Sequence, residues 1–210
     1  MLQRIRRLLV ANRGEIAIRV MRAAAELGVR TVAIYSQEDR FSLHRTKADE
    51  AYLVGEGKGP VEAYLDIADI LRVAREAHVD AIHPGYGFLS ENADFAEKVE
   101  RSGFVFIGPR PENIRLMGDK VSAKQAMIKA GVPCVPGSEG ALPDDPKEIV
   151  KVARTVGYPV IIKAAGGGGG RGMRVVHTEA ALLSAVTLTR GEAQSAFGNP
   201  TVYMEKFLTT

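Results

Sequence analysis

The sequence has few cysteines and no long apolar runs. These two absences exclude a disulfide-rich protein and a membrane-spanning protein. Cys134 is the one cysteine among 210 residues. This excludes an internal disulfide framework and fits a reducing compartment, the cytoplasm or, in a eukaryote, the mitochondrial matrix. The apolar stretches are too short to cross a bilayer. The opening MLQRIRRLLV lacks a cleavage-like site, so neither a signal peptide nor a membrane partner is expected.

Neither sign of charge dominates, and metal-binding patterns are lacking. The 28 basic and 25 acidic residues leave a net charge of +3, and the basic cluster Arg4, Arg6 and Arg7 has no interleaved aromatic residues. A nucleic-acid partner is therefore excluded, and an anionic small molecule such as a nucleotide is favoured. There is no HExxH or CxxC pattern, and His83 has no evident metal partner.

The first half of the chain alternates β-type runs with helical patterns. Strands are expected at 8–12, 31–36, 51–54, 81–84 and 104–108, and helices at 15–27, 66–77 and 91–102. This alternation predicts βαβ units and a parallel, doubly wound sheet with helices on both faces. We expect Ser90 to cap the helix that follows it.

The helix expected at 15–27 has two distinct faces. Its apolar stripe consists of Ile16, Val20, Ala23, Ala24 and Leu27, a pattern typical of a helix packed on a core. The second face is polar and consists of Arg19, Arg22 and Glu26. Taken alone, that polar stripe is a solvated surface.

From Pro109 the pattern changes to a smaller α+β arrangement. Helices are expected at 111–118, 119–131, 146–157 and 178–197, strands at 158–165, 173–178 and 201–208, and a Pro/Gly-rich connection at 132–145. We therefore expect a first domain at 1–117, a helical connection at 118–133 and a second domain at 134–210.

A glycine run between two strands is the strongest chemical signal. It consists of Gly166, Gly167, Gly168, Gly169 and Gly170. Because these residues have no Cβ, their N–H groups can approach an anion closely. Lys163, on the preceding strand, adds a cationic charge for phosphate oxygens. Such runs are often flexible linkers, but the flanking strands and the nearby lysine favour phosphate binding.

Three familiar phosphate motifs do not fit this loop. A dinucleotide fingerprint needs a helix after its glycines, whereas the residues after Gly172 are β-like. A Walker A loop needs lysine after its last glycine, where Met173 stands, and a kinase lysine follows its loop, whereas Lys163 precedes it. Lys120, at the start of a predicted helix, is a second candidate for phosphate contact.

Seven segments occur in an order that resembles a known family. They are NRGEIAIRVMRAA, HPGYGFLSEN, FIGP, RLMGDKVSAK, GVPCVPG, YPVIIKAAGGGGGRGMRVV and YMEKFL. Together they resemble the biotin carboxylase domain of acetyl-CoA, pyruvate and propionyl-CoA carboxylases. The resemblance implies a Rossmann-like pre-ATP-grasp domain followed by an ATP-grasp subdomain. The glycine-loop segment alone is shared with carbamoyl-phosphate synthetases, so the ordered set carries the resemblance.

The family resemblance also implies an activity and partners. Such ligases carboxylate biotin on a carrier protein, using ATP, bicarbonate and Mg²⁺ or Mn²⁺, by way of carboxyphosphate. The implied partners are a biotin carboxyl carrier protein or domain, a carboxyltransferase component and a second copy in a homodimer. The final carboxyl acceptor, such as acetyl-CoA in fatty acid biosynthesis, propionyl-CoA or pyruvate, is selected by another domain.

Matching motifs imply roles for individual residues. Lys120 and Lys163 would contact ATP phosphates beneath a lid formed by Gly166 to Gly170. Met173 would pack near the adenine. The remaining assignments are Glu205, Lys206 and Leu208 at the adenine edge, Tyr86 and Gly87 near biotin, and Arg19, Arg22 and Glu26 in a dimer contact.

Two alternatives remain open beside a biotin carboxylase. One is another ATP-grasp ligase, such as a carbamoyl-phosphate synthetase, and the other is a non-catalytic nucleotide-binding module. In the family, the acidic metal ligands follow the segment matched here, and this sequence stops at Thr210. We therefore expect no metal site within these 210 residues and no complete reaction from them alone.

Overall fold

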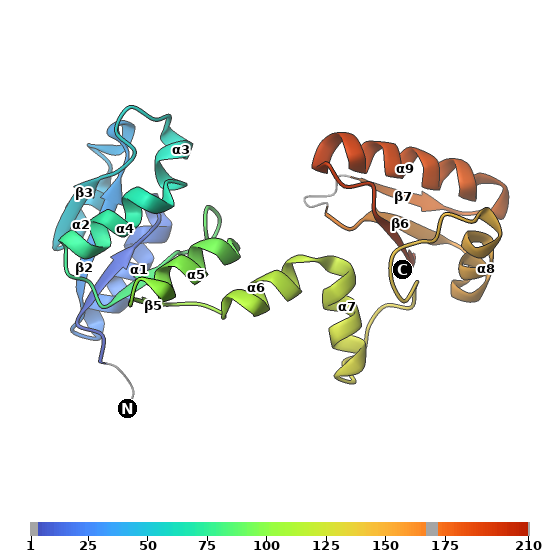
Figure 1. Cartoon of the computed structure of the whole chain (residues 1–210), viewed down its shortest axis with the longest axis horizontal. Helices are drawn as coiled ribbons and strands as arrows, with labels where there is room; N and C mark the ends of the chain where they lie inside the picture. The colour runs from blue at the N-terminus through green and yellow to red at the C-terminus, as the bar shows by residue number, and fades with distance from the viewer. Residues whose placement is uncertain (1–3, 167–171, 210) are drawn as a thin grey trace. The chain divides into compact units, whose positions relative to one another are not determined.

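The computed structural model describes residues 4–166 and 172–209 (Figure 1). The chain divides into two compact units, Met1–Arg115 and Leu116–Thr210. The division falls inside helix α6 (Pro111–Gly118). The three-part division at 1–117, 118–133 and 134–210 stays a prediction about domains.

A parallel sheet forms the centre of the first unit. Its five strands have the order β3-β2-β1-β4-β5, and each neighbouring pair is parallel. The strands are β1 (Arg7–Val10), β2 (Arg30–Tyr35), β3 (Glu50–Leu53), β4 (Ala81–His83) and β5 (Val105–Phe106). The predicted parallel α/β sheet is confirmed.

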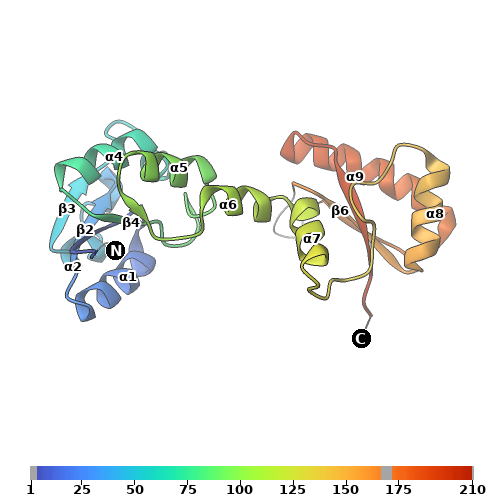
Figure 2. The same cartoon turned by 60° about the horizontal axis from the view of Figure 1, so that its bottom comes forward.

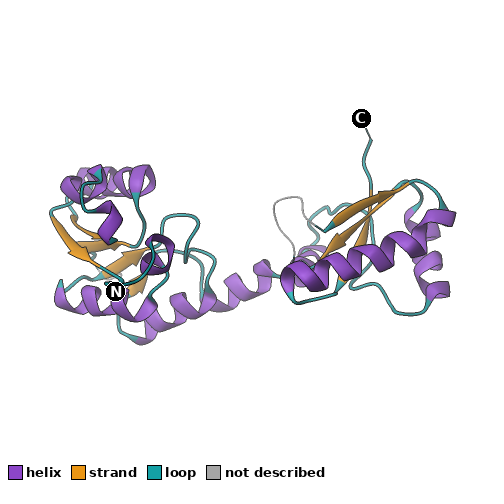
Figure 3. Cartoon of the chain, turned by 90° about the horizontal axis from the view of Figure 1, so that it is seen from above, coloured by secondary structure: helices purple, strands orange, loops and turns teal. Residues whose placement is uncertain are grey.

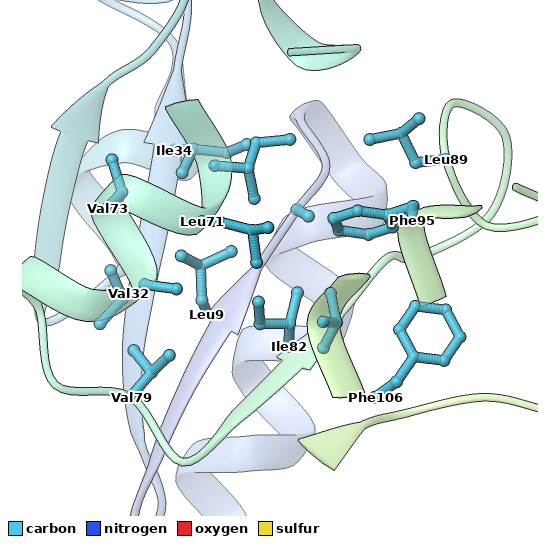
Figure 4. Close-up of a cluster of buried hydrophobic side chains, with 14 of the residues drawn as sticks. Leu9, Val32, Ile34, Leu71, Val73, Val79, Ile82, Leu89, Phe95 and Phe106 are labelled. Carbon is cyan, nitrogen blue, oxygen red and sulfur yellow. The ribbon is translucent and has the colours of Figure 1, made fainter. Parts of the chain in front are cut away.

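Helices cover both faces of this sheet (Figure 2 and Figure 3). On one face α1 packs through Ala17, Met21 and Ala24. On the other, α4 and α5 pack around Leu9, Ile34 and Ile82 of the strands (Figure 4). The bounds are α1 (Gly14–Glu26), α2 (Leu43–Lys47), α3 (Pro60–Tyr64), α4 (Ile67–Glu76), α5 (Ala93–Arg101) and a 3₁₀ turn at Gln37–Asp39.

Two details of this unit differ from the sequence prediction. The cap of α5 is Asn92, whose Oδ1 accepts a hydrogen bond from the Phe95 N–H at 2.8 Å, and not Ser90. The apolar stripe predicted for α1 faces the core only in part, since Ala24 is 4% exposed and Val20 packs against the core, whereas Leu27, just after the helix, is 80% exposed. Ala17 and Met21, which lie outside the predicted stripe, complete the buried face of α1.

An antiparallel sheet forms the centre of the second unit. Its strands have the order β7-β6-β8. The bounds are α7 (Lys120–Lys129), α8 (Pro146–Val156), β6 (Val160–Ala164), β7 (Met173–Val176), a 3₁₀ turn at Glu179–Ala181, α9 (Leu182–Phe197) and β8 (Val202–Lys206). The predicted smaller α+β arrangement is confirmed.

Alternate residues of this sheet build one apolar core. Val160, Ile162 and Met204 are buried against α8 and α9, and α9 lies along the sheet (Figure 3). Because successive side chains of a strand point to opposite faces, the residues between them face away from these helices. Across residues 4–166 and 172–209, no helix is long and apolar enough to span a membrane.

Candidate functional site

The face of the three-stranded sheet away from α8 and α9 collects polar side chains. Lys163 of β6 pairs in register with Met173 of β7 and with Tyr203 of β8, and Glu205 stands opposite Ile161. These positions alternate with the buried core residues, so Lys163, Met173, Tyr203 and Glu205 share one face. β6 leads at its end to Gly166, where the glycine run begins. Gly167, Gly168, Gly169 and Gly170 lie outside the described residues.

Glu205 joins two lysines on this face. Its Oε2 lies 2.7 Å from the Lys163 Nζ, and its Oε1 lies 2.9 Å from the Lys124 Nζ. Burial would raise the pKa of Glu205, but hydrogen bonds from Lys163 and Lys124 outweigh burial and lower the pKa below its usual value. The carboxylate is therefore charged at neutral pH and is balanced by two ammonium groups. Burial, and then Glu205, raises the pKa of Tyr203 to about 12.

Two of the three lysines of α7, Lys120 and Lys124, reach this face from one side of the helix. Asp119 caps α7 by accepting a hydrogen bond from the Ser122 N–H at 2.8 Å. Lys120 follows the cap, and its Nζ lies 3.5 Å from the Ala165 carbonyl oxygen, next to the glycine run. Lys124 lies one turn further along the same face. Lys124 was not among the residues predicted from the sequence, although its spacing of four residues from Lys120 places both on one side of a helix.

The segment before Glu139 is attached to the edge of β8. The Ser138 N–H donates to the Met204 carbonyl at 2.8 Å, and the Met204 N–H donates to the Ser138 Oγ at 3.0 Å. A Cβ on Gly137 would lie 2.3 Å from the Met204 carbonyl oxygen and 2.8 Å from the Lys124 Nζ. Only glycine fits between β8 and the Lys124 ammonium.

The residues expected at the adenine edge have different surroundings. The Glu205 carboxylate faces the lysines. The Lys206 side chain points elsewhere, since its Nζ donates to the carbonyls of Gly157 at 3.0 Å and Tyr158 at 2.7 Å. Leu208 is 68% exposed and Met173 44% exposed. Lys163, Glu205 and Lys120 are thus gathered at one end of the sheet, whereas the Lys206 ammonium is directed to the end of α8.

In the first unit, buried Asn12 fixes the loop that follows β4. Its Nδ2 donates to the carbonyls of Pro84 at 2.8 Å and Tyr86 at 3.0 Å. The Tyr86 hydroxyl donates to the Glu15 Oε1 at 2.7 Å, and this bond raises the pKa of Tyr86. Gly87 lies in the same loop with a positive φ of 71°. Tyr86 is therefore an exposed side chain on a backbone held from inside.

The face of α1 that carries the expected dimer residues is open. Arg19, Arg22 and Glu26 are all exposed. Arg19 borders a groove of about 540 Å³ whose apolar wall includes Ile5, Leu8, Ile16, Val20, Leu27 and Val29. Elsewhere in the described part of the chain, no three His, Cys, Asp or Glu side chains gather as metal ligands would.

Comparison with known proteins covers both units. Residues 4–114 match the family described as the biotin carboxylase N-terminal domain. Residues 119–210 match the family described as the ATP-binding domain of the carbamoyl-phosphate synthase L chain. The biotin carboxylase of Pseudomonas aeruginosa is 60% identical over 98% of this chain and 45% of its own length. The pyruvate carboxylase of Bacillus subtilis is 56% identical over 98% of this chain and 18% of its own.

Solved structures show the same fold. A biotin carboxylase–β-γ-ATP complex from Campylobacter jejuni superposes with a TM-score of 0.87 at 46% identity, over 98% of this chain and 46% of that chain. The biotin carboxylase domain dimer of Hydrogenobacter thermophilus 2-oxoglutarate carboxylase, in complex with MgADP, ADP and bicarbonate, superposes with a TM-score of 0.86 at 47% identity. The match covers 98% of this chain and 45% of that chain. This chain spans less than half the length of the biotin carboxylases it matches.

Proposed function

This chain belongs to the biotin carboxylase family, and on that premise we propose that it forms the part of such a ligase that holds the phosphates of ATP. The reaction would be ATP- and bicarbonate-dependent carboxylation of biotin on a carrier protein by way of carboxyphosphate. The observation that carries the proposal is the gathering of Lys163, Lys120 and Gly166 at one end of the β7-β6-β8 sheet.

Each gathered residue has a role in this proposal. Bound ATP would supply the phosphoryl group that activates bicarbonate. Lys163 and Lys120 would provide the positive potential for its phosphates, and the N–H groups from Gly166 onward would donate to phosphate oxygens. Met173 would pack on the adenine, and backbone groups of Glu205, Lys206 and Leu208 would line its edge. No Mg²⁺ ligand is assigned in this proposal.

The proposal extends to the wider assembly. Tyr86 and Gly87 would lie close to biotin, and Arg19, Arg22 and Glu26 would contact a second copy in a homodimer. Their exposure on α1 beside an apolar groove supports that contact. A biotin carboxyl carrier and a carboxyltransferase would complete the cycle in the cytoplasm, with acetyl-CoA carboxylase of fatty acid biosynthesis as the first setting to test. Pyruvate carboxylases match these residues as well, so the acceptor is chosen elsewhere.

Carbamoyl-phosphate synthesis is the competing activity. It is favoured only by the match of residues 119–210, a domain that both ligase classes share. The match of residues 4–114 favours the biotin carboxylase. A non-catalytic nucleotide-binding module would use the same phosphate contacts, so nucleotide binding is the property to establish first.

Calorimetric titration with ATP tests the phosphate site. We expect Lys163→Met to weaken ATP binding about tenfold or more, because a charge-assisted hydrogen bond is lost. Glu205 keeps Lys124 as a partner in this variant, so the fold should persist. Lys129→Met, which removes an exposed lysine from the same unit, serves as the matched control. Equal ATP affinity in both variants would contradict the proposed role of Lys163 in phosphate binding.

A further inference from the structure

The two lysines that contact Glu205 differ in how far their side chains are exposed. The side chains of Lys124 and Glu205 are 11% and 13% exposed, whereas that of Lys163 is 28% exposed. Lys163 is therefore the partner with room to turn toward a ligand. Lys124 is confined, because the backbone at Gly137 stands so close to its ammonium that a Cβ there would lie 2.8 Å away.

In this arrangement a bound polyphosphate and the Glu205 carboxylate would conflict, because both need the Lys163 ammonium. Lys163 holds the Glu205 Oε2 at 2.7 Å, and a phosphate would compete for the same ammonium. A nearly buried carboxylate that loses its cation is strongly destabilised. It would also repel the incoming phosphates, because like charges a few ångström apart repel each other.

We infer that Lys124 resolves this conflict as a positioning residue: it retains the Glu205 carboxylate when Lys163 turns to a nucleotide phosphate. The inference rests on the proposed nucleotide site and deepens it. Lys124 touches no phosphate in this scheme and acts only through Glu205. Its removal should therefore affect ligands that carry phosphates and leave a bare nucleoside unaffected.

Titration with ATP and with adenosine provides the test. We expect Lys124→Met to weaken ATP binding about tenfold and adenosine binding less than twofold, whereas Lys124→Arg keeps both within about threefold of the unaltered chain. Lys129→Met should leave both affinities unchanged. Equal loss of ATP and adenosine binding would show a merely structural role and overturn the inference.

A double variant keeps the test decisive if Lys124→Met folds poorly. In Lys124→Met/Glu205→Gln the charge that needs compensation is gone, so ATP affinity should return to within about threefold of that of Glu205→Gln alone. Persistent loss of ATP binding in the double variant would contradict the scheme. Absence of ATP binding by the unaltered chain would instead overturn the proposed function, and the inference with it.

Discussion

At the scale of single residues, Asp39 shows how a charge is kept inside the first unit. It is 4% exposed. Arg13 donates to its Oδ1 at 2.6 Å, Ser42 to the same oxygen at 2.7 Å, and the Tyr64 hydroxyl to its Oδ2 at 2.7 Å. Burial would raise the pKa of Asp39, but the hydrogen bonds from Arg13, Tyr64 and Ser42 outweigh it and lower the pKa.

Stability of the first unit should therefore depend on Asp39 in acid. Because its pKa is lower in the folded than in the unfolded chain, its contribution is present above the unfolded value of 3.8 and lost as the pH falls through the folded value. We expect Asp39→Asn to lower the free energy of unfolding by about 2 kcal/mol at pH 7 and to flatten its decline below about pH 4. Urea unfolding of both chains between pH 3 and pH 7 measures this. Parallel pH curves would refute it.

Two glycines of one loop allow a matched comparison. Gly85 and Gly87 both have positive φ, at 66° and 71°. A Cβ on Gly85 would lie 2.7 Å from the Asn12 Nδ2 and 2.8 Å from the Ile16 Cγ2, whereas a Cβ on Gly87 meets nothing within 4 Å. We expect Gly87→Ala to cost about 1 kcal/mol of unfolding free energy, and Gly85→Ala about 3 kcal/mol through the added clash. Similar denaturation midpoints would mean that Asn12 does not constrain this loop.

At the scale of elements, the start of α5 gives a direct test of capping. The Asn92 Oδ1 accepts the Phe95 N–H at 2.8 Å, whereas Ser90 lies two residues earlier, with its backbone N–H bonded to the Gly87 carbonyl. We expect Asn92→Ala to destabilise the first unit by about 1 kcal/mol, and Ser90→Ala to change it by less than about 0.5 kcal/mol. Thermal unfolding of the two variants distinguishes them, and the reverse order would restore Ser90 as the cap.

The elements that sequence could predict are those with a clear period or a full apolar run. The buried parallel strands and the helices α4, α5 and α8 were visible in this way. α2 and α3 were missed because five residues are too few to display a helical period. The core face of α1 was identified only in part: the predicted stripe contains Ala24 but omits Ala17 and Met21, which are also buried.

Part of the candidate site was also predictable from the sequence. Lys163 and the glycine run stand out in the sequence because flanking strands frame them. The pairing of Glu205 with Lys124 was not visible, since it joins residues 81 positions apart. Only the fold of β8 against α7 brings them into contact.

At the scale of the whole molecule, the apolar cores of the two units have no residue in common. The clusters around Leu9 and Val10 belong to the first unit, and the cluster around Ile162 belongs to the second. Each unit therefore has a core of its own, and cooperative unfolding of each unit is expected.

Calorimetric unfolding should show two transitions, and ATP should raise one of them. A ligand that binds only the folded second unit stabilises it by about 2.7 kcal/mol at a hundredfold excess over Kd. We expect Lys163→Met to reduce this stabilisation to about 1.4 kcal/mol or less at the same ATP concentration, and Asp39→Asn to lower the other transition alone. A single transition that responds to both changes would show that the units unfold together.

The segment 136–142 has a consequence for behaviour at high concentration. The Ser138, Leu142 and Lys206 N–H groups make backbone hydrogen bonds of 2.7–2.8 Å across the outer side of β8, which occupies that edge of the sheet. β7 is the other edge in the order β7-β6-β8. It is four residues long, and its Arg174 is paired with Glu192 of α9. Strand addition between molecules, the first step of ordered aggregation, thus has only a short and charged edge of this described sheet from which to begin.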